Sequence, residues 1–113
     1  LESAFPGHRA VGEPEIRSAF AELCPPVRAR GGPAAHRPDL LLLPSEFPAA
    51  PATAVEVELT VKAPARLERI CRAWARQRGI GGVIYIAPDS VRRPLERAIG
   101  RADAGERIVI VPM

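Results

Sequence analysis

The stretch AVEVELTVK, residues 54–62, constrains the fold more than any other part of the chain, because its polar and apolar residues alternate. Its apolar residues are Ala54, Val55, Val57, Leu59 and Val61. Its polar residues are Glu56, Glu58, Thr60 and Lys62. Successive side chains of a strand point to opposite faces, so the pattern predicts a strand over 54–61 with its apolar face in the core. The polar face is then either a solvent-exposed surface or part of an active site.

Helix and strand patterns surround this segment. Apolar periodicity and helix-start residues predict helices over 14–24, 64–78 and 91–101, the last capped by Asp89 or Ser90. The face of the second helix that should be buried carries Leu67, Ile70, Cys71, Trp74 and Ala75. Compact apolar runs predict further strands over 27–30, 39–43, 83–87 and 107–111. Strands joined through helices are parallel neighbours, so we expect an α/β domain: a mixed sheet with helices on both faces.

Size and composition point to one domain over residues 1–113. The chain has 113 residues and is 47% hydrophobic, which suits a single core. It starts at Leu1 rather than at a methionine, so we expect it to be a fragment of a longer protein. No apolar run approaches the roughly 20 residues of a membrane helix, so a soluble, cytoplasmic domain is expected. Cys24 and Cys71 lie beside apolar neighbours, which favours buried thiols over a disulfide or metal pair.

Charge is distributed unevenly along the chain. Residues 1–58 contain five Arg and eight acidic residues, whereas residues 66–107 contain ten Arg and five acidic residues. Lys62 is the only lysine. An acidic first half and an arginine-rich second half are compatible with a metal-binding cluster beside a phosphate-binding surface, although an ordinary solvated helix face explains the arginines as well.

Two acidic positions can meet if the strands over 39–43 and 54–61 are neighbours. Asp39 would then face Glu56 across roughly 5 Å at one end of the sheet. Two carboxylates that close repel each other without a cation, and they suit a hard divalent ion such as Mg²⁺ or Mn²⁺. The alternative is the solvent face of an edge strand, where charges discourage aggregation. The Pro38-Asp39 pair, which precedes this strand in the sequence, favours the metal site over the solvent-exposed face.

Several short motifs occur in an order that resembles a known superfamily. They are His8, Glu15-Ile16-Arg17-Ser18-Ala19, His36-Arg37-Pro38-Asp39 and the run from Val55 to Lys62, followed by an arginine-rich helix. In this order they resemble the PD-(D/E)XK, or restriction-endonuclease-like, nucleases. The resemblance is closer to the nuclease-like domain of actinobacterial replication-relaxation proteins, which plasmids and integrative elements encode. It covers residues 8–113 and implies an αβββαβ core with an extra C-terminal helix and strand.

The resemblance implies that the domain hydrolyses phosphodiester bonds in DNA. Asp39 and Glu56 would bind the metal with help from the backbone carbonyl of Val57, and the metal would activate a water. Glu15 matches a position that often supplies another acid, but a surface glutamate in a first helical turn is an equal alternative. The expected DNA-binding residues are Arg37, Arg66, Arg69, Arg72 and Arg76.

The chain departs from the family pattern where a lysine is expected. Two residues after Glu56 it has Glu58, and Lys62 follows only six residues after Glu56. On an extended strand that separation is roughly 20 Å at about 3.3 Å per residue, so Lys62 reaches the metal only if the backbone turns back. Three outcomes follow: Glu58 replaces the lysine as ligand or base, the metal lies nearer Glu58 and Lys62, or the site is degenerate. We favour the first.

The expected function is therefore that of a Mg²⁺- or Mn²⁺-dependent DNA endonuclease or nickase in a plasmid or mobile-element protein. A homodimer and other domains of the parent chain are further partners to consider, and no membrane association is expected. The main alternative is a catalytically silent domain that binds DNA or protein. A third is a globular domain with no nucleic-acid role. The sequence contains no glycine-rich phosphate loop with a lysine, no paired-cysteine zinc spacing and no serine elbow.

Overall fold

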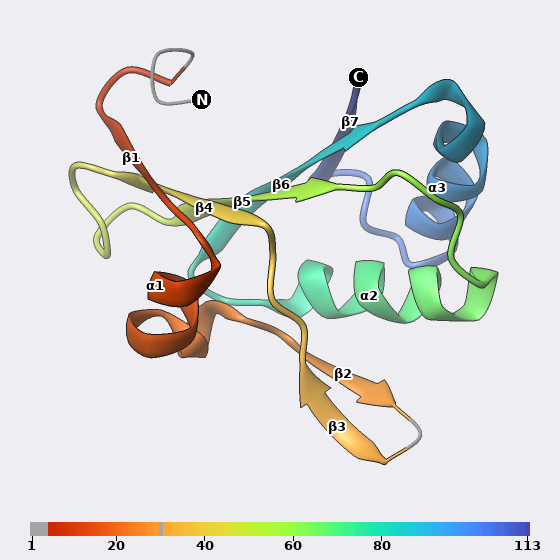
Figure 1. The fold of residues 1–113 in the computed structure, drawn as a ribbon, viewed down its shortest axis with the longest axis horizontal. Helices are drawn as coiled ribbons and strands as arrows, with labels where there is room; N and C mark the ends of the chain where they lie inside the picture. Colours follow the sequence, from red (N-terminus) through yellow and green to blue (C-terminus); the bar gives the residue numbers. More distant parts are fainter. Residues whose placement is uncertain (1–4, 30) are drawn as a thin grey trace.

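A mixed five-stranded sheet is the framework of the protein (Figure 1). The computed structural model describes residues 5–29 and 31–113. The sheet has the order β1-β4-β5-β6-β7. These strands are β1 (His8–Val11), β4 (Leu40–Pro44), β5 (Ala52–Val57), β6 (Ile80–Ala87) and β7 (Ile108–Pro112). β4 pairs antiparallel with β1 and β5, whereas β6 pairs parallel with β5 and β7, so the predicted mixed α/β sheet is confirmed.

The helices lie on one side of this sheet. They are α1 (Glu13–Ala19), a short 3₁₀ turn (Ala21–Leu23), α2 (Pro64–Arg76) and α3 (Asp89–Arg101). α2 joins β5 to β6, and α3 joins β6 to β7. Both connections move in the same direction across the sheet, and such connections are right-handed, so both helices lie on the same face. α2 and α3 contact each other accordingly, and α1 lies beneath β4 (Figure 1). The expectation of helices on both faces was wrong.

The start of each helix follows partly from its sequence. Pro14 and Pro64 occupy first-turn positions, where a missing backbone N–H has no cost. The predicted cap of α3 by Asp89 or Ser90 was wrong, because Pro88 is the N-cap and no side chain caps this helix.

One hydrophobic core fills the space between the sheet and the helices. Ile16 of α1 is fully buried, and so are Trp74 of α2 and Leu95 of α3. The buried residues of α2 are Leu67, Ile70, Cys71 and Trp74, as the helical periodicity predicts, with Ala75 partly buried beside them. Cys24 and Cys71 are buried free thiols, as predicted. Among the described residues, no helix is long and apolar enough to cross a membrane.

β5 presents the opposite face to the core from the one that the alternating pattern predicts. Glu56 and Glu58 are buried at 6% and 7% exposure, on the side of the helices. Val57, Leu59 and Val61 are 42%, 62% and 52% exposed. The strand also ends at Val57 instead of continuing to residue 61. Because β5 is the central strand of five, the alternative of a solvated edge strand is also wrong.

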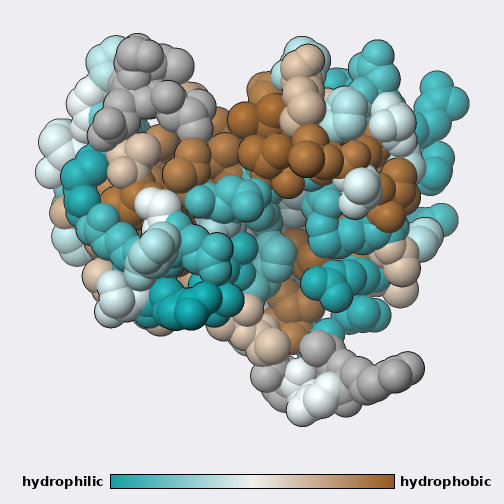
Figure 2. All heavy atoms as spheres, viewed as in Figure 1, coloured by the Kyte–Doolittle hydropathy of each residue, from teal (hydrophilic) through white to brown (hydrophobic). Residues whose placement is uncertain are grey.

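The other face of the sheet is aliphatic and carries no described helix. Its rows are in register across the strands: Leu40, Val55, Ile84 and Val109 form one row, and Val57, Ile86 and Val111 form the next. Figure 2 shows hydrophobic side chains gathered along this upper side of the molecule. Branched aliphatic side chains therefore stabilise the strands from both faces, which explains why hydropathy alone did not identify the core side.

A second, two-stranded sheet projects from the main body (Figure 1). It is an antiparallel hairpin of β2 (Pro26–Ala29) and β3 (Gly32–Ala35). The strand predicted over 27–30 therefore exists but lies outside the main sheet, and β3 forms where a turn was expected. β1, which was not predicted, lies beside β4. The three consecutive core strands that the resemblance implies are thus not all in one sheet.

A pair of leucines tests the assignment of the core side. Leu95→Ala, at a fully buried position, should lower the free energy of unfolding by about 2–5 kcal/mol because it leaves a cavity. Leu59→Ala makes the same change at 62% exposure and should alter it by less than about 0.5 kcal/mol. Urea denaturation followed by circular dichroism measures both, and equal losses would contradict the arrangement of the layers.

Candidate functional site

Glu56 is the centre of a buried polar cluster between β5 and α2. Its Oε2 accepts hydrogen bonds from His36 Nε2 at 2.5 Å and from Trp74 Nε1 at 3.1 Å. The rings of His36 and Trp74 contact each other edge to face, with centroids 5.9 Å apart. A buried carboxylate needs such partners, because an unpaired one would lose its hydration without compensation. The two rings therefore fix the position of this carboxylate.

Asp39 approaches the same segment of β5 from the start of β4. Its backbone N–H donates to the Val55 carbonyl at 3.1 Å, and its Oδ2 accepts the Val57 N–H at 2.7 Å. These contacts are to the residues immediately before and after Glu56. Asp39 itself is exposed. The predicted neighbourhood of β4 and β5 is confirmed, and it brings Asp39 to the backbone between Glu56 and Glu58.

Lys62 folds back onto Glu58. The chain leaves the sheet after Val57, and the Lys62 Nζ donates to the Glu58 Oε1. The Glu58 N–H donates to the Ile86 carbonyl at 3.0 Å, which anchors the start of this turn to β6. The extended path from Glu56 to Lys62 was therefore wrong, because residues 58–63 turn back at the start of α2. The single lysine of the chain reaches this end of β5 through Glu58.

Glu56 and Glu58 lie in buried surroundings. The pKa of the Cys71 thiol is raised to about 12, mainly by burial, and the charges of Glu56 and Glu58 contribute to this rise. Burial also raises the pKa of the Tyr85 hydroxyl well above its usual value, with Glu56 as the next cause. Both groups are therefore neutral near pH 7 and add no negative charge beside Glu56 and Glu58.

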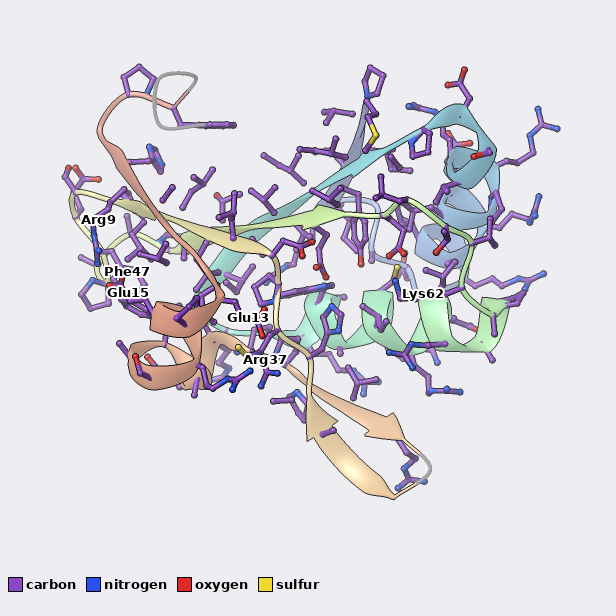
Figure 3. The ribbon with its side chains drawn as sticks, in the orientation of Figure 1. Arg9, Glu13, Glu15, Arg37, Phe47 and Lys62 are labelled. Carbon is purple, nitrogen blue, oxygen red and sulfur yellow. The ribbon has the colours of Figure 1, made fainter. Side chains whose placement is uncertain are left out.

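Two other residues proposed for the site lie elsewhere. Glu15 pairs with Arg9 at 3.0 Å, and Arg37 pairs with Glu13 at 3.6 Å. Figure 3 places both pairs apart from Lys62. The structure thus brings together Asp39, Glu56, Glu58 and Lys62, but it does not bring Glu15 or Arg37 to them.

His36 is a site residue that sequence reasoning missed. A histidine in a loop usually has no special role, and the hairpin that positions it was not predicted. The available signal was its place three residues before Asp39, in the segment that links β3 to β4.

The oxygen atoms near Asp39 limit the type of metal site that can form. No group of three or more His, Cys, Asp or Glu side chains within residues 5–29 and 31–113 is arranged to hold an ion. Asp39 Oδ1, Glu56 Oε1 and Glu58 Oε2 make no hydrogen bond to the described residues. Mg²⁺ commonly uses only one or two carboxylates and keeps several waters, so an ion held here would need water ligands.

The arginines of α2 lie beyond this cluster. Arg66, Arg69 and Arg76 are exposed, and Arg72 pairs with Glu68 at 2.9 Å. They lie on the helix that directly follows Lys62.

The raised pKa of Cys71 makes stability depend on pH. The unfolded thiol loses its proton near pH 9, whereas the folded thiol keeps it up to about pH 12, so rising pH favours unfolding in this range. The free energy of unfolding should fall between about pH 9 and pH 12. Cys71→Ala should reduce this fall relative to wild type in urea titrations. An identical pH dependence of the two proteins would contradict a buried, neutral thiol.

Comparisons with known proteins do not connect the chain to a family. No family model matches it, and neither a curated protein nor a solved structure is similar to it. Functional assignment therefore rests on the arrangement of Asp39, Glu56, Glu58 and Lys62, and on the arginines of α2.

Proposed function

We propose that the chain is a Mg²⁺- or Mn²⁺-dependent DNA endonuclease or nickase with a PD-(D/E)XK-like core, acting within a plasmid or mobile-element protein. The observation that carries the proposal is the convergence of Asp39, Glu56, Glu58 and Lys62 at one end of β5. Acids on two adjoining strands and a lysine are the residue types that metal-assisted phosphodiester hydrolysis requires.

The topology around these residues supports the same proposal. Asp39 immediately precedes β4, Glu56 lies on the antiparallel neighbour β5, and α2 then leads to the parallel strand β6. The run from β4 through β5 and α2 to β6 is compatible with this part of a PD-(D/E)XK core, whereas the strand beside β4 is β1, which precedes α1 instead of following it. The β2–β3 hairpin is then an addition between α1 and the strand that Asp39 precedes.

Each residue has a distinct chemical role in the proposal. Asp39 and Glu56 hold the ion, and Glu56 can do so through Oε1 while His36 and Trp74 keep Oε2 in place. A divalent ion lowers the pKa of water and neutralises charge on the phosphate. Glu58 occupies the position where the family pattern has a lysine, and we assign it the role of proton acceptor. Lys62 supplies the positive charge beside it.

A catalytically silent scaffold that binds DNA is the second candidate. It is favoured by the hydrogen bonds that already occupy Glu56 Oε2 and by the ion pair between Glu58 and Lys62. A buried polar cluster of this kind can stabilise a fold without binding an ion. The two candidates differ in metal binding: the nuclease needs Asp39 as a metal ligand, whereas the scaffold does not.

Nicking of supercoiled plasmid by the purified chain tests the proposal. Wild type should nick with Mg²⁺ or Mn²⁺ and not with EDTA. Asp39→Asn should reduce the rate about 100-fold or more, because it removes a ligand charge without changing the size of the side chain. Lys62→Ala and Glu58→Gln report whether these residues take part in the reaction or only pair with each other.

Asp103→Asn is the matched control. Asp103 is an exposed residue after α3 with a φ of 54°, a conformation that asparagine tolerates well. This variant makes the same chemical change beside Gly81, near the end of β5 opposite to Glu56, and should nick at the wild-type rate. Metal-independent nicking, or equal rates for Asp39→Asn and Asp103→Asn, would refute the proposal. A folded wild type that never nicks would favour the scaffold.

A further inference from the structure

A groove runs between the β2–β3 hairpin and α2. It consists of two adjoining cavities of about 300 and 440 Å³, and both are lined by Val27, Arg28 and Arg69. Val27 packs against the main core, which holds the hairpin in place beside α2. A two-stranded hairpin has little stability alone, so this contact accounts for its ordered position.

Arginines dominate the lining of the groove. They are Arg28 from the hairpin and Arg66, Arg69, Arg72 and Arg76 from α2. Arg72 pairs with Glu68, whereas the other four have no acidic partner among the described residues. No acidic residue and no Phe, Tyr or Trp is among the described residues that line either cavity. A concave site with several unpaired guanidinium groups suits an extended chain of phosphates.

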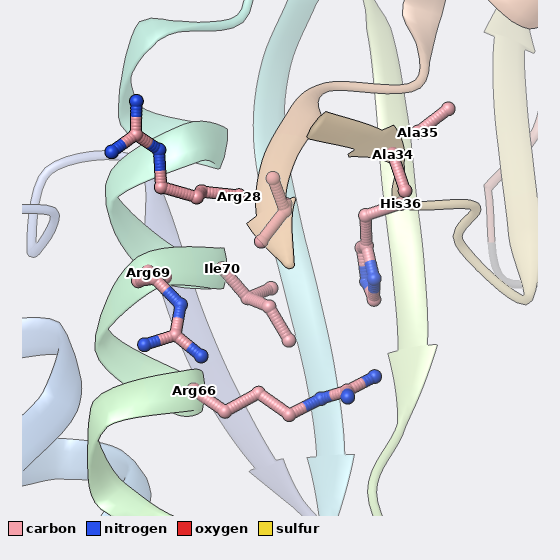
Figure 4. Close-up of a pocket in the computed structure, with 8 residues that line it drawn as sticks. Arg28, Ala34, Ala35, His36, Arg66, Arg69 and Ile70 are labelled. Atoms are coloured by element: carbon pink, nitrogen blue, oxygen red, sulfur yellow. The ribbon is translucent and has the colours of Figure 1, made fainter. Parts of the chain in front are cut away.

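The groove leads to the candidate site. His36 lines the first cavity, and its Nε2 contacts Glu56 Oε2 at 2.5 Å. Figure 4 shows Arg66 extending from α2 toward the His36 side of this cavity, with Arg69 on the same helix and Arg28 reaching toward that helix from β2. From Arg66 to Arg76 the helix rises about 15 Å, roughly the length of four stacked nucleotides at about 3.4 Å each.

We propose that this groove binds the sugar–phosphate backbone of one DNA strand and directs it past His36 toward Glu56. The hairpin, through Arg28, forms one wall and α2 forms the other. Because no Phe, Tyr or Trp is among the described lining residues to stack on bases, the contact is to phosphates and tolerates any sequence. The identity of the strand as DNA rests on the proposed function, whereas the groove itself rests on its arginines.

Fluorescence anisotropy with a labelled DNA single strand of about 20 nucleotides, in EDTA so that no cutting occurs, tests the groove. Wild type should bind with an affinity that falls steeply with salt and is similar for mixed-sequence and oligo-dT strands. Arg28→Ala/Arg69→Ala should weaken binding about 10-fold or more at low salt. It should also reduce the slope of log K against log salt by about 1.4, the value for two lost phosphate contacts on a single strand.

Arg93→Ala/Arg97→Ala is the control, because it removes two exposed arginines from α3, outside the groove. It should change the Kd by less than about threefold. Equal losses of affinity in the two double variants, or no DNA binding by wild type, would refute the proposal that this groove binds a DNA strand. Binding that depends on Arg28 and Arg69 without any nicking in Mg²⁺ or Mn²⁺ would overturn the nuclease proposal and leave the groove intact.

Discussion

The hydrogen bonds to the Glu56 carboxylate are the interaction on which the site depends. A carboxylate at 6% exposure is stable only because His36 and Trp74 supply its partners. These two residues come from different layers, one from the segment after the hairpin and one from α2. The contact therefore joins the hairpin, the central strand and the helix, and it orients β5 with its glutamates toward α2.

The path of the chain explains why polar residues face the helices. β5, β6 and β7 follow one another across the sheet, and both connecting helices return on the same side. The buried side chains on the helix side are then those of Ala52, Ala54 and Glu56 of β5, and that of Glu58 directly after it. The glutamates lie at the end of the strand and just after it, where Trp74 pairs with Glu56 and Lys62 pairs with Glu58. The valines of the same strand lie on the opposite, helix-free face.

Much of the fold follows from local sequence, but the site depends on contacts that no short segment reveals. The apolar stripe of α2, the adjacency of β4 and β5 and the parallel pairs around β6 agree with the patterns that predict them. The orientation of β5 does not, because alternation indicates two faces without saying which one meets the helices. The position of Lys62 was also missed, since strict alternation predicted four more residues of strand, whereas the chain turns after Val57. His36 reaches Glu56 only because a hairpin forms between α1 and β4.

A crystal structure of the chain soaked with Mn²⁺, with anomalous scattering recorded, tests the central claim most directly. The account predicts an anomalous peak bound by Asp39 and Glu56, with His36 and Trp74 still holding the second oxygen of Glu56. An Asp39→Asn crystal treated in the same way should lack this peak. A well-ordered wild-type site with no manganese, or manganese bound only at unrelated surface acids, would contradict the claim that the end of β5 is a metal centre.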